Sequence, residues 1–301
     1  MSYNPLVSIV MNCYNGDVYL KEALNSVINQ SYSNWELIFW DNKSTDRSIE
    51  IFKSYKDKRF KLFHSQEHSI LYKARNEAIQ KTSGELIAFL DTDDIWFSDK
   101  LEKQISFFKE ENVGLVYGNF FTFNESSLLK KKIFSKKKLP TGNVLTKILS
   151  EYSIGLSTIV IRKKSLKNFS NVFNTKYDLL ADYDFAINFS IENEFQCIQD
   201  PVAQIRIQEK STSHKFKEEQ IKQLKLWYSS IELHPIISKK KEMKKALERI
   251  NYMEIMQILS TKKFPDGFNR VLKFPFGMKK IKLILALILP KKIFLKLKKL
   301  N

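Results

Sequence analysis

The sequence predicts an α/β fold with a mainly parallel, Rossmann-like central sheet and helices on both faces, followed by a helical, basic C-terminal extension. Apolar segments rich in β-branched residues alternate with segments of helical periodicity through the first part of the 301-residue chain. Several of these apolar segments end abruptly in carboxylate or amide side chains. Positive charge is concentrated near the C-terminus. These observations predict a ligand-binding domain over residues 1–218 and a helical, basic region over residues 219–301.

The elements expected in the first domain follow from hydrophobic periodicity and from turn residues at their ends. Strands are predicted at residues 7–11, 35–40, 60–63, 86–90, 113–117 and 156–161. Helices are predicted to begin near Asp17, to be capped by Ser44, Thr45 or Asp46, to span residues 71–82 with Gly84 in the C-cap position, and to start again at Ser98 and near Asp182.

The strand at residues 86–90 carries the most informative pattern. Five consecutive apolar residues are followed by Asp91, Thr92, Asp93 and Asp94, which indicates a buried strand that delivers three carboxylates to a sheet edge. Adjacent carboxylates repel one another unless a cation compensates their charge, and Mg²⁺ binds one or two carboxylates together with substrate phosphates. The alternative is that Asp93 or Asp94 only caps a helix.

Polar residues also follow the first two predicted strands, namely Tyr14 with Asn15 and Asp41 with Asn42. In parallel α/β sheets, ligands bind beyond the carboxyl ends of the strands, so these side chains are expected to converge with Asp91–Asp94 on one crevice. The fold class suggests a nucleotide, yet the chain has neither a Gly-x-Gly-x-x-Gly turn nor a Gly-Lys-Ser/Thr phosphate loop. A metal ion held by the carboxylates would neutralise a diphosphate instead.

A second carboxylate cluster, Asp178, Asp182 and Asp184, lies at the start of a predicted helix. From spacing alone, Asp182 is either a partner of the helix dipole or an active-site residue. Arg206 follows a further short strand and is positioned to bring a cation to the same crevice.

Five ordered motifs resemble those of the family 2 glycosyltransferases. They are Val-Ser-Ile-Val-Met-Asn-Cys-Tyr-Asn at 7–15, Asp-Asn-Lys-Ser-Thr-Asp at 41–46, Lys-Ala-Arg-Asn at 73–76, Phe-Leu-Asp-Thr-Asp-Asp at 89–94 and Ala-Asp-Tyr-Asp at 181–184. The resemblance covers roughly residues 5–215. It implies the GT-A fold and transfer of a sugar from a nucleotide-diphosphate donor, with inversion at the anomeric carbon and with Mn²⁺ or Mg²⁺ as the usual cofactor.

The resemblance also implies roles for individual positions. Those expected to bind the donor are Asn12, Tyr14, Asp41, Asn42, Arg75, Asp91 and Thr92. Those expected at the metal are Asp91, Asp93 and Asp94, with Asp93 the direct ligand. Asp182 falls where the family places its general base.

Three features, at four positions, depart from the family pattern. Asn12 and Cys13 replace a common Pro-Thr pair, Ala181 replaces a glutamate, and Gln208 replaces a histidine that is sometimes a metal ligand. The first departure leaves the base of the donor open, the second removes a supporting acid beside the predicted general base, and the third concerns the metal shell. The Gln-x-x-Arg-Trp signature and the membrane spans of processive synthases are absent, which favours addition of a single sugar.

The formal net charge of +17 belongs mostly to the C-terminal region, where residues 236–301 hold 18 Lys and Arg against 4 Asp and Glu. After Pro290, apolar and basic residues recur on separate helical faces; they are Ile293, Leu297 and Leu300 on one face and Lys292, Lys296 and Lys299 on the other. The aliphatic run at 283–289 is too short to span a bilayer. A basic amphipathic helix on an anionic membrane surface is expected. Packing on protein and binding of nucleic acid are the alternatives, and the aliphatic run favours lipid over nucleic acid.

The expected protein is therefore a cytoplasmic enzyme, peripheral on the cytoplasmic face of the membrane, because Cys13 and Cys197 cannot form a disulfide framework and no signal peptide is recognisable. It would add one sugar, from a donor for which UDP is favoured, to a glycan or lipid-linked acceptor in surface polysaccharide synthesis. Two alternatives remain. A sugar-1-phosphate nucleotidyltransferase would need a glycine-rich loop, and a degenerate scaffold protein draws support from Ala181 and Gln208.

Overall fold

The computed structural model describes residues 3–124, 131–208, 217–260 and 264–289. The chain divides into two compact units, Met1–Glu209 and Lys210–Asn301. The predicted tail helix after Pro290 lies outside the described residues.

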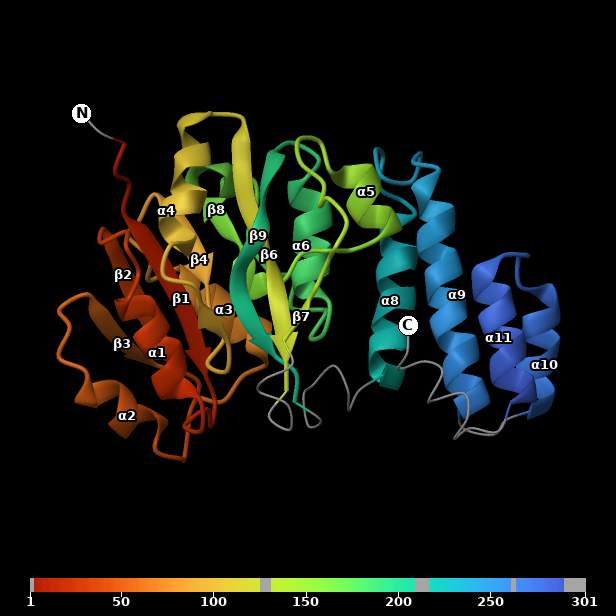
Figure 1. The fold of residues 1–301 in the computed structure, drawn as a ribbon, viewed down its shortest axis with the longest axis horizontal. Helices are drawn as coiled ribbons and strands as arrows, with labels where there is room; N and C mark the ends of the chain where they lie inside the picture. The colour runs from red at the N-terminus through yellow and green to blue at the C-terminus, as the bar shows by residue number, and fades with distance from the viewer. Residues whose placement is uncertain (1–2, 125–130, 209–216, 261–263, 290–301) are drawn as a thin grey trace. The chain divides into compact units, whose positions relative to one another are not determined.

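The described strands of the first unit form one nine-stranded sheet (Figure 1). The strands are β1 (Val7–Cys13), β2 (Trp35–Asp41), β3 (Phe60–His64), β4 (Leu86–Phe89), β5 (Ile95–Trp96), β6 (Val113–Phe123), β7 (Lys132–Ile133), β8 (Val160–Arg162) and β9 (Glu194–Arg206). Their order is β3-β2-β1-β4-β8-β6-β9-β5, with β7 beside β6. β8, β5 and β7 run against their neighbours, whereas the other strands share one direction. The predicted, mainly parallel α/β sheet is confirmed.

Helices cover both faces of this sheet. They are α1 (Leu20–Ile28), α2 (Ser48–Ser54), α3 (Leu71–Ile79), α4 (Lys100–Ile105), α5 (Leu145–Ser150) and α6 (Ala181–Phe189). Alternate residues of β1, such as Val7, Ile9 and Met11, belong to one hydrophobic core together with residues of α1, α2 and α4. On the opposite face, the Phe173 ring contacts Phe89 of β4, Tyr72 of α3 and Phe185 of α6. Burial on both faces explains why the strands are continuous apolar runs.

Several elements differ from the sequence prediction. β1, β6 and β9 are longer than expected, and they continue as far as Cys13, Phe123 and Arg206. Gly84 does not cap α3, which ends at Ile79. Gly84 instead lies against β1, where a Cβ atom would come within 2.5 Å of the Leu6 carbonyl oxygen. The prediction for Gly84 was wrong because its close approach to a distant strand gives the same local signal as a helix end.

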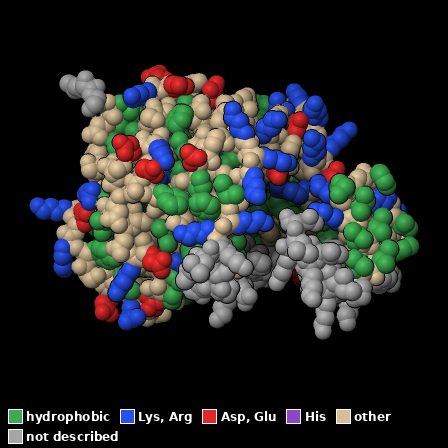
Figure 2. All heavy atoms as spheres, viewed as in Figure 1, with side chains coloured by type: hydrophobic (Ala, Val, Ile, Leu, Met, Phe, Trp, Pro, Cys, Tyr) green, Lys and Arg blue, Asp and Glu red, His purple; other side chains and the backbone are tan. Residues whose placement is uncertain are grey.

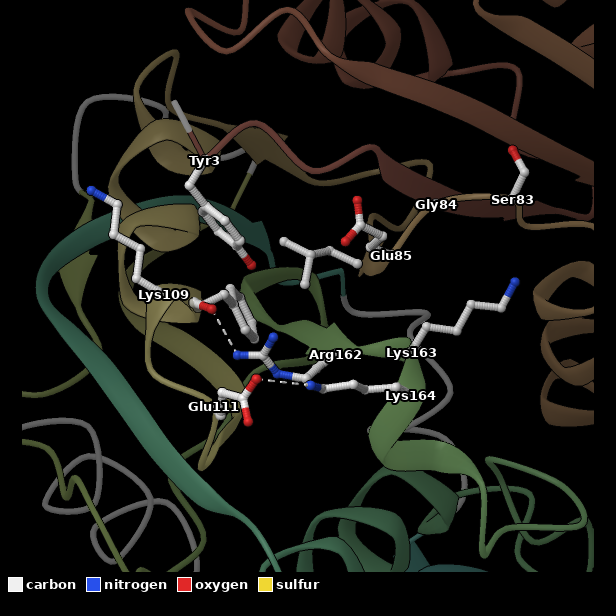
Figure 3. Close-up of a pocket in the computed structure, with 11 residues that line it drawn as sticks. Tyr3, Ser83, Gly84, Glu85, Lys109, Glu111, Arg162, Lys163 and Lys164 are labelled. Atoms are coloured by element: carbon white, nitrogen blue, oxygen red, sulfur yellow. Dashed lines mark hydrogen bonds and ion pairs between the residues drawn. The ribbon is translucent and has the colours of Figure 1, made fainter. Parts of the chain in front are cut away.

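A cavity of about 640 Å³ lies at the amino ends of β4 and β6, opposite the predicted ligand edge (Figure 3). Two of its cationic side chains, Arg162 and Lys163, donate to backbone carbonyl oxygens of the protein itself. The Arg162 guanidinium donates to the carbonyl oxygens of Phe108, Glu110 and Val113 at 2.7–3.0 Å. Lys163 Nζ donates to the Thr82 carbonyl at 2.6 Å. These contacts tie the segments around the amino end of the sheet together, which is a structural role for Arg162 and Lys163.

The second unit is helical, with α8 (Lys217–Ile231), α9 (Glu242–Ser260), α10 (Phe264–Lys273) and α11 (Met278–Ile288). Ile255 of α9, Val271 and Phe274 around the end of α10, and Leu283 of α11 form its buried core. Pro265 and Gly267 lie within the first turn of α10, where a helix tolerates proline because the first amides lack partners anyway. Among the described residues, no helix is long and apolar enough to cross a bilayer.

Candidate active site

The Asp91–Asp94 segment forms a turn between β4 and β5. The Asp94 amide donates to the Asp91 carbonyl at 3.2 Å, and the Leu90 amide donates to Val10 of β1. β5 then pairs with β9, which places Ile95 opposite Gln204. The turn is therefore fixed on both sides, as the buried strand before it predicted.

Asp91 is paired with a cationic side chain of α3, Arg75. Its Oδ1 accepts from the guanidinium of Arg75, which is buried whereas Asp91 is partly exposed. Two predicted donor-binding residues are thus brought into direct contact. A buried arginine paired with a carboxylate holds that carboxylate in a fixed orientation.

Asp93 lies between two residues of the segment that ends β9. Gln208 Nε2 donates to its Oδ2 at 2.8 Å, and Arg206 Nε donates to its backbone carbonyl at 3.1 Å. Burial and then the charge of Asp91 raise the pKa of the Asp93 carboxyl above its usual value. A carboxylate that is buried beside another carboxylate is stabilised by a cation.

Asp94 has a different environment from its two acidic neighbours. It is buried, its Oδ2 accepts from Ser157 Oγ at 2.5 Å, and its Oδ1 accepts from the Arg206 amide at 3.0 Å. Burial and then the charges of Asp93 and Asp91 raise the pKa of Asp94 well above its usual value. Because both oxygens accept hydrogen bonds from the protein, this geometry favours a positioning role over the metal-ligand role predicted from sequence.

Asp182 reaches the same region from the first turn of α6. Its Oδ1 accepts from the Tyr72 hydroxyl at 3.1 Å. Burial raises the pKa of the Asp182 carboxyl, while the Tyr72 hydrogen bond and the positive charge of Arg75 act in the opposite direction. Since Arg75 also holds Asp91, α3 connects the predicted base with the predicted donor carboxylate.

The ends of β1 and β2 form a second part of the site. The Asn15 amide donates to Ser44 Oγ at 3.1 Å, and the Gly16 amide donates to Ser48 Oγ at 3.0 Å. Gly16 also lies against Thr92, because a Cβ atom there would come within 2.8 Å of the threonine hydroxyl. This close approach places Thr92 beside the loop after β1, and its predicted contact with the donor stays a prediction.

Asp41 and Asn42, at the end of β2, are buried, and their side chains contact the segments on either side. Asp41 Oδ1 accepts from the Ser44 amide at 3.1 Å, and its Oδ2 lies 3.4 Å from His64 Nδ1. The Asn42 carboxamide both donates to and accepts from the Ser69 backbone, at 2.8 and 3.1 Å. Asn42 therefore fixes the segment before α3, and its predicted contact with the donor stays a prediction.

Tyr14 presents an exposed aromatic surface beside these loops. Its ring centroid lies 4.1 Å from that of His68, and 51% of the residue is exposed. His68 Nδ1 is 3.1 Å from the Asn42 carbonyl oxygen. Exposed aromatic faces are surfaces on which nucleobases stack, which is consistent with the predicted nucleoside contact of Tyr14.

Asn12 is buried near the end of β1, and both polar atoms of its side chain lack a hydrogen-bond partner among the described residues. It alternates with Cys13, so it lies on the same face of the sheet as α3. Buried polar groups in folded proteins are normally paired. An unpaired carboxamide at the ligand edge of the sheet indicates a group that a ligand completes.

A hard divalent cation fits the residues present. No group of three or more His, Cys, Asp or Glu side chains able to hold a metal occurs within residues 3–124, 131–208, 217–260 and 264–289. Asp91, Asp93 and the Gln208 amide nevertheless offer oxygen ligands, which is the donor type that Mg²⁺ completes with water and substrate phosphates.

Sequence reasoning missed Tyr72, Ser157 and His68, since no local motif marks a partner that is distant in the chain.

The chain resembles known glycosyltransferases over most of its length. The family model described as Glycosyl transferase family 2 matches residues 8–169. A relative from Escherichia coli, the UDP-Glc:alpha-D-GlcNAc-diphosphoundecaprenol beta-1,3-glucosyltransferase WfgD, is 34% identical over 71% of this chain and 82% of its own length.

Two solved structures share the fold. One is Staphylococcus aureus TarS 1-349 in complex with UDP-GlcNAc, with a TM-score of 0.59 and 19% identity over 95% of this chain and 82% of that one. The other is the mannosyltransferase PcManGT from Pyrobaculum calidifontis in complex with GDP-Man and Mn²⁺, with a TM-score of 0.66 and 16% identity over 99% and 84%. The chain therefore belongs to glycosyl transferase family 2, and it is a glycosyltransferase with the GT-A fold.

Proposed function

We propose that the protein transfers one sugar, with inversion, from a UDP-sugar to a hydroxyl of a lipid-linked glycan in surface polysaccharide synthesis. The observation that carries this proposal is the joint position of Asp91 and Asp182, which α3 connects through Arg75 and Tyr72. One carboxylate serves the donor, and the other serves the acceptor. The relative WfgD is named for UDP-glucose and for a GlcNAc-diphosphoundecaprenol acceptor, which supports this choice of donor and acceptor class.

On the donor side, Tyr14 would stack on the base, and Asn12 would hydrogen-bond the nucleoside. Arg75 would orient Asp91, and Gln208 would orient Asp93. These two carboxylates would hold Mn²⁺ or Mg²⁺, and the bound ion would neutralise charge on the departing diphosphate.

On the acceptor side, Asp182 would act as general base. Its carboxylate takes the proton of the acceptor hydroxyl while that oxygen attacks the anomeric carbon from the face opposite the diphosphate. The new carbon–oxygen bond forms as the bond to the diphosphate breaks, and UDP leaves with the electron pair. A raised pKa, caused by burial, makes Asp182 a stronger base than an exposed aspartate.

Replacing Asp182 by Asn tests this assignment. Transfer from UDP-glucose to a synthetic GlcNAc-diphosphate lipid should fall by about 10²–10⁴-fold, because Asn cannot accept the proton. Asp178→Asn is a matched control, since Asp178 belongs to the same acidic cluster in sequence but has no assigned role. Full activity of the Asp182→Asn variant would disprove the assignment, and absence of transfer by the unaltered protein with every UDP-sugar would disprove the function.

The α10–α11 pair supplies a surface for an anionic membrane, which would place the enzyme beside its lipid-linked acceptor. Figure 2 shows apolar side chains gathered over these two helices. The exposed ones are Phe268, Leu272, Phe276, Met278, Ile281, Ile284, Leu285 and Ile288, and the cations of the same segment are Arg270, Lys273, Lys279, Lys280 and Lys282. Soluble monomers rarely expose a continuous apolar patch of this kind. Each lysine near anionic lipid adds on the order of 1 kcal/mol.

Both cysteines, Cys13 and Cys197, are free thiols, which agrees with the cytoplasmic face as the site of action.

Flotation with vesicles that contain phosphatidylglycerol tests the membrane contact. The combined changes Phe276→Ser, Met278→Ser and Ile288→Ser should reduce the bound fraction at least about tenfold. Leu233→Ser, at another exposed leucine of the second unit, should leave binding unchanged. Equal flotation of the two variants would show that this surface does not bind the membrane.

A further inference from the structure

Tyr72 is the side chain that contacts the predicted base, and nothing in the sequence marked it. It lies in the first turn of α3 and is buried. Its ring packs against Phe173 with a centroid distance of 5.1 Å, and the Arg75 guanidinium carbon lies 5.0 Å from the ring centroid. The ring is therefore held on two sides while its hydroxyl donates to Asp182 Oδ1 at 3.1 Å.

We propose that Tyr72 is a positioning residue for the general base, holding one oxygen of Asp182 so that the other oxygen meets the acceptor hydroxyl. This inference rests on the proposed role of Asp182. A carboxylate on a two-torsion side chain can rotate, and a fixed hydrogen bond to one oxygen removes that freedom before the acceptor arrives. Tyr72 itself transfers no proton.

A tyrosine suits this task because it remains a donor. Burial, reinforced by the charge of Asp182, raises the pKa of Tyr72 well above its usual value, so the hydroxyl keeps its proton throughout the range in which enzymes work. The hydrogen bond in turn stabilises the ionised form of Asp182 and opposes the effect of burial on its pKa. Tyr72 thus both orients Asp182 and keeps it ionised.

The other groups that face Asp182 do not replace this contact. Arg75 interacts with it by charge, and its guanidinium is already paired with Asp91. The backbone amides of Asp182 and Tyr183, in the first turn of α6, favour the ionised carboxylate. Tyr152 also lies near Asp182, and its ring packs at 5.0 Å on that of Tyr183. Among these groups, the Tyr72 hydroxyl is the side-chain donor to Asp182 that fixes one of its oxygens.

The helix that carries Tyr72 also links the base to the donor. Tyr72 and Arg75 are three residues apart and therefore share one face of α3. Through them, Asp182 and Asp91 are held by the same rigid element. A shift of α3 would move both carboxylates together, which keeps the base and the donor in register.

The variant Tyr72→Phe tests the proposal, because it keeps the ring and removes only the hydroxyl. We expect kcat for transfer from UDP-glucose to a GlcNAc-diphosphate lipid to fall about tenfold, with the KM for UDP-glucose unchanged within about twofold. The pH profile of kcat/KM supplies the sharper measurement. Without the hydrogen bond, the pKa of Asp182 rises, so the limb on which activity is lost as pH falls should move to higher pH.

The matched control is Tyr32→Phe, which removes another partly buried tyrosine hydroxyl that donates to a backbone carbonyl, at Pro5, 2.6 Å away. It should leave both kcat and the acid limb unchanged. An acid limb that stays in place in Tyr72→Phe, with or without a lowered Tm, overturns the proposal and reduces Tyr72 to a packing residue. If instead Asp182→Asn retains full activity, the proposed function of Asp182 fails, and the inference about Tyr72 fails with it.

Discussion

The two ends of the central sheet both carry polar and charged side chains, but these side chains differ in the partners that they find within the protein. At the amino end, Arg162 donates to three carbonyl oxygens, and Glu36 accepts from Ser8, Ser83 and Lys61. Every charge named there has a partner within the protein. At the carboxyl end, the Asn12 side chain has no hydrogen-bond partner among the described residues, and the pKa of Asp93 is raised by burial and by the neighbouring charge of Asp91. Proteins normally pair buried polar groups, so the unpaired Asn12 carboxamide, together with the raised pKa of Asp93, marks the carboxyl end as the one that a ligand completes.

The largest effect that would test this comparison is expected from Asp93→Asn. Loss of a carboxylate from the proposed metal site should reduce transfer about 10³-fold, which corresponds to about 4 kcal/mol of transition-state stabilisation. Stability should not fall, because the change relieves repulsion from Asp91. Activity assays measure the loss of transfer, and Tm measures stability. Titration of Mn²⁺ by electron paramagnetic resonance in the presence of UDP measures the affinity of the variant for the metal ion.

Asp94→Asn is the contrasting variant at the adjacent position. Asp94 accepts from Ser157 and from the Arg206 amide, so a weakened contact there should lower Tm. If Asp93→Asn lowered Tm while activity per folded molecule stayed constant, the carboxyl end would be structural like the amino end, and the comparison would break.

The second prediction concerns Glu36 at the amino end. Burial would raise its pKa, but hydrogen bonds from Lys61, Ser8 and Ser83 outweigh burial and lower the pKa from 4.5 to about 2. The folded-state pKa is depressed, so the stabilisation is present above pH 4.5 and is lost as pH falls toward 2. The difference amounts to about 3 kcal/mol.

Urea unfolding of the unaltered protein and of Glu36→Gln, measured from pH 6 to pH 2.5, would reveal this contribution. The free energy of unfolding of the variant should depend less on pH in that range. Glu50→Gln serves as control, because Glu50 is exposed on α2. A pH dependence that is identical in Glu36→Gln and in the unaltered protein would contradict the assigned network.

The sequence signals that predict a ligand site at the carboxyl end are local, and the structure brings several of these residues together. The apolar run of β4 predicts burial, and Asp91, Thr92 and Asp93 directly after it predict a polar ligand site, so both signals lie within a few residues. The pairing of Asp94 with Ser157, 63 residues away, and of Tyr72 with Asp182, 110 residues away, has no local signal. The amino end was missed for the same reason, since Arg162 reads as an ordinary surface cation until β8 is seen between β4 and β6. The predicted membrane helix after Pro290 stays a prediction.

The smallest effect, and the most direct comparison, comes from two positions on one face of β1. Ser8 lies near the amino end and donates to Glu36 Oε1 at 2.5 Å, whereas Asn12 lies near the carboxyl end and has no side-chain hydrogen bond within the part of the chain that the structure describes. Asn12→Ala should raise the KM for the donor about tenfold, or about 1.4 kcal/mol, and should change Tm little, because the protein loses no internal hydrogen bond. Ser8→Ala should lower Tm and leave the KM unchanged.

Thermal shift with UDP-, GDP- and dTDP-sugars, with and without Mn²⁺, would measure both variants and would also identify the base that Asn12 contacts. Reduced stabilisation by one nucleotide alone, in Asn12→Ala only, would assign the carboxamide to recognition of that base. Equal loss with all three nucleotides would place Asn12 on the ribose or the phosphates, which every donor shares. The two residues lie on the same strand and the same face. A raised KM in Asn12→Ala and a lowered Tm in Ser8→Ala would therefore indicate a ligand site at the carboxyl end and an internal hydrogen-bond network at the amino end.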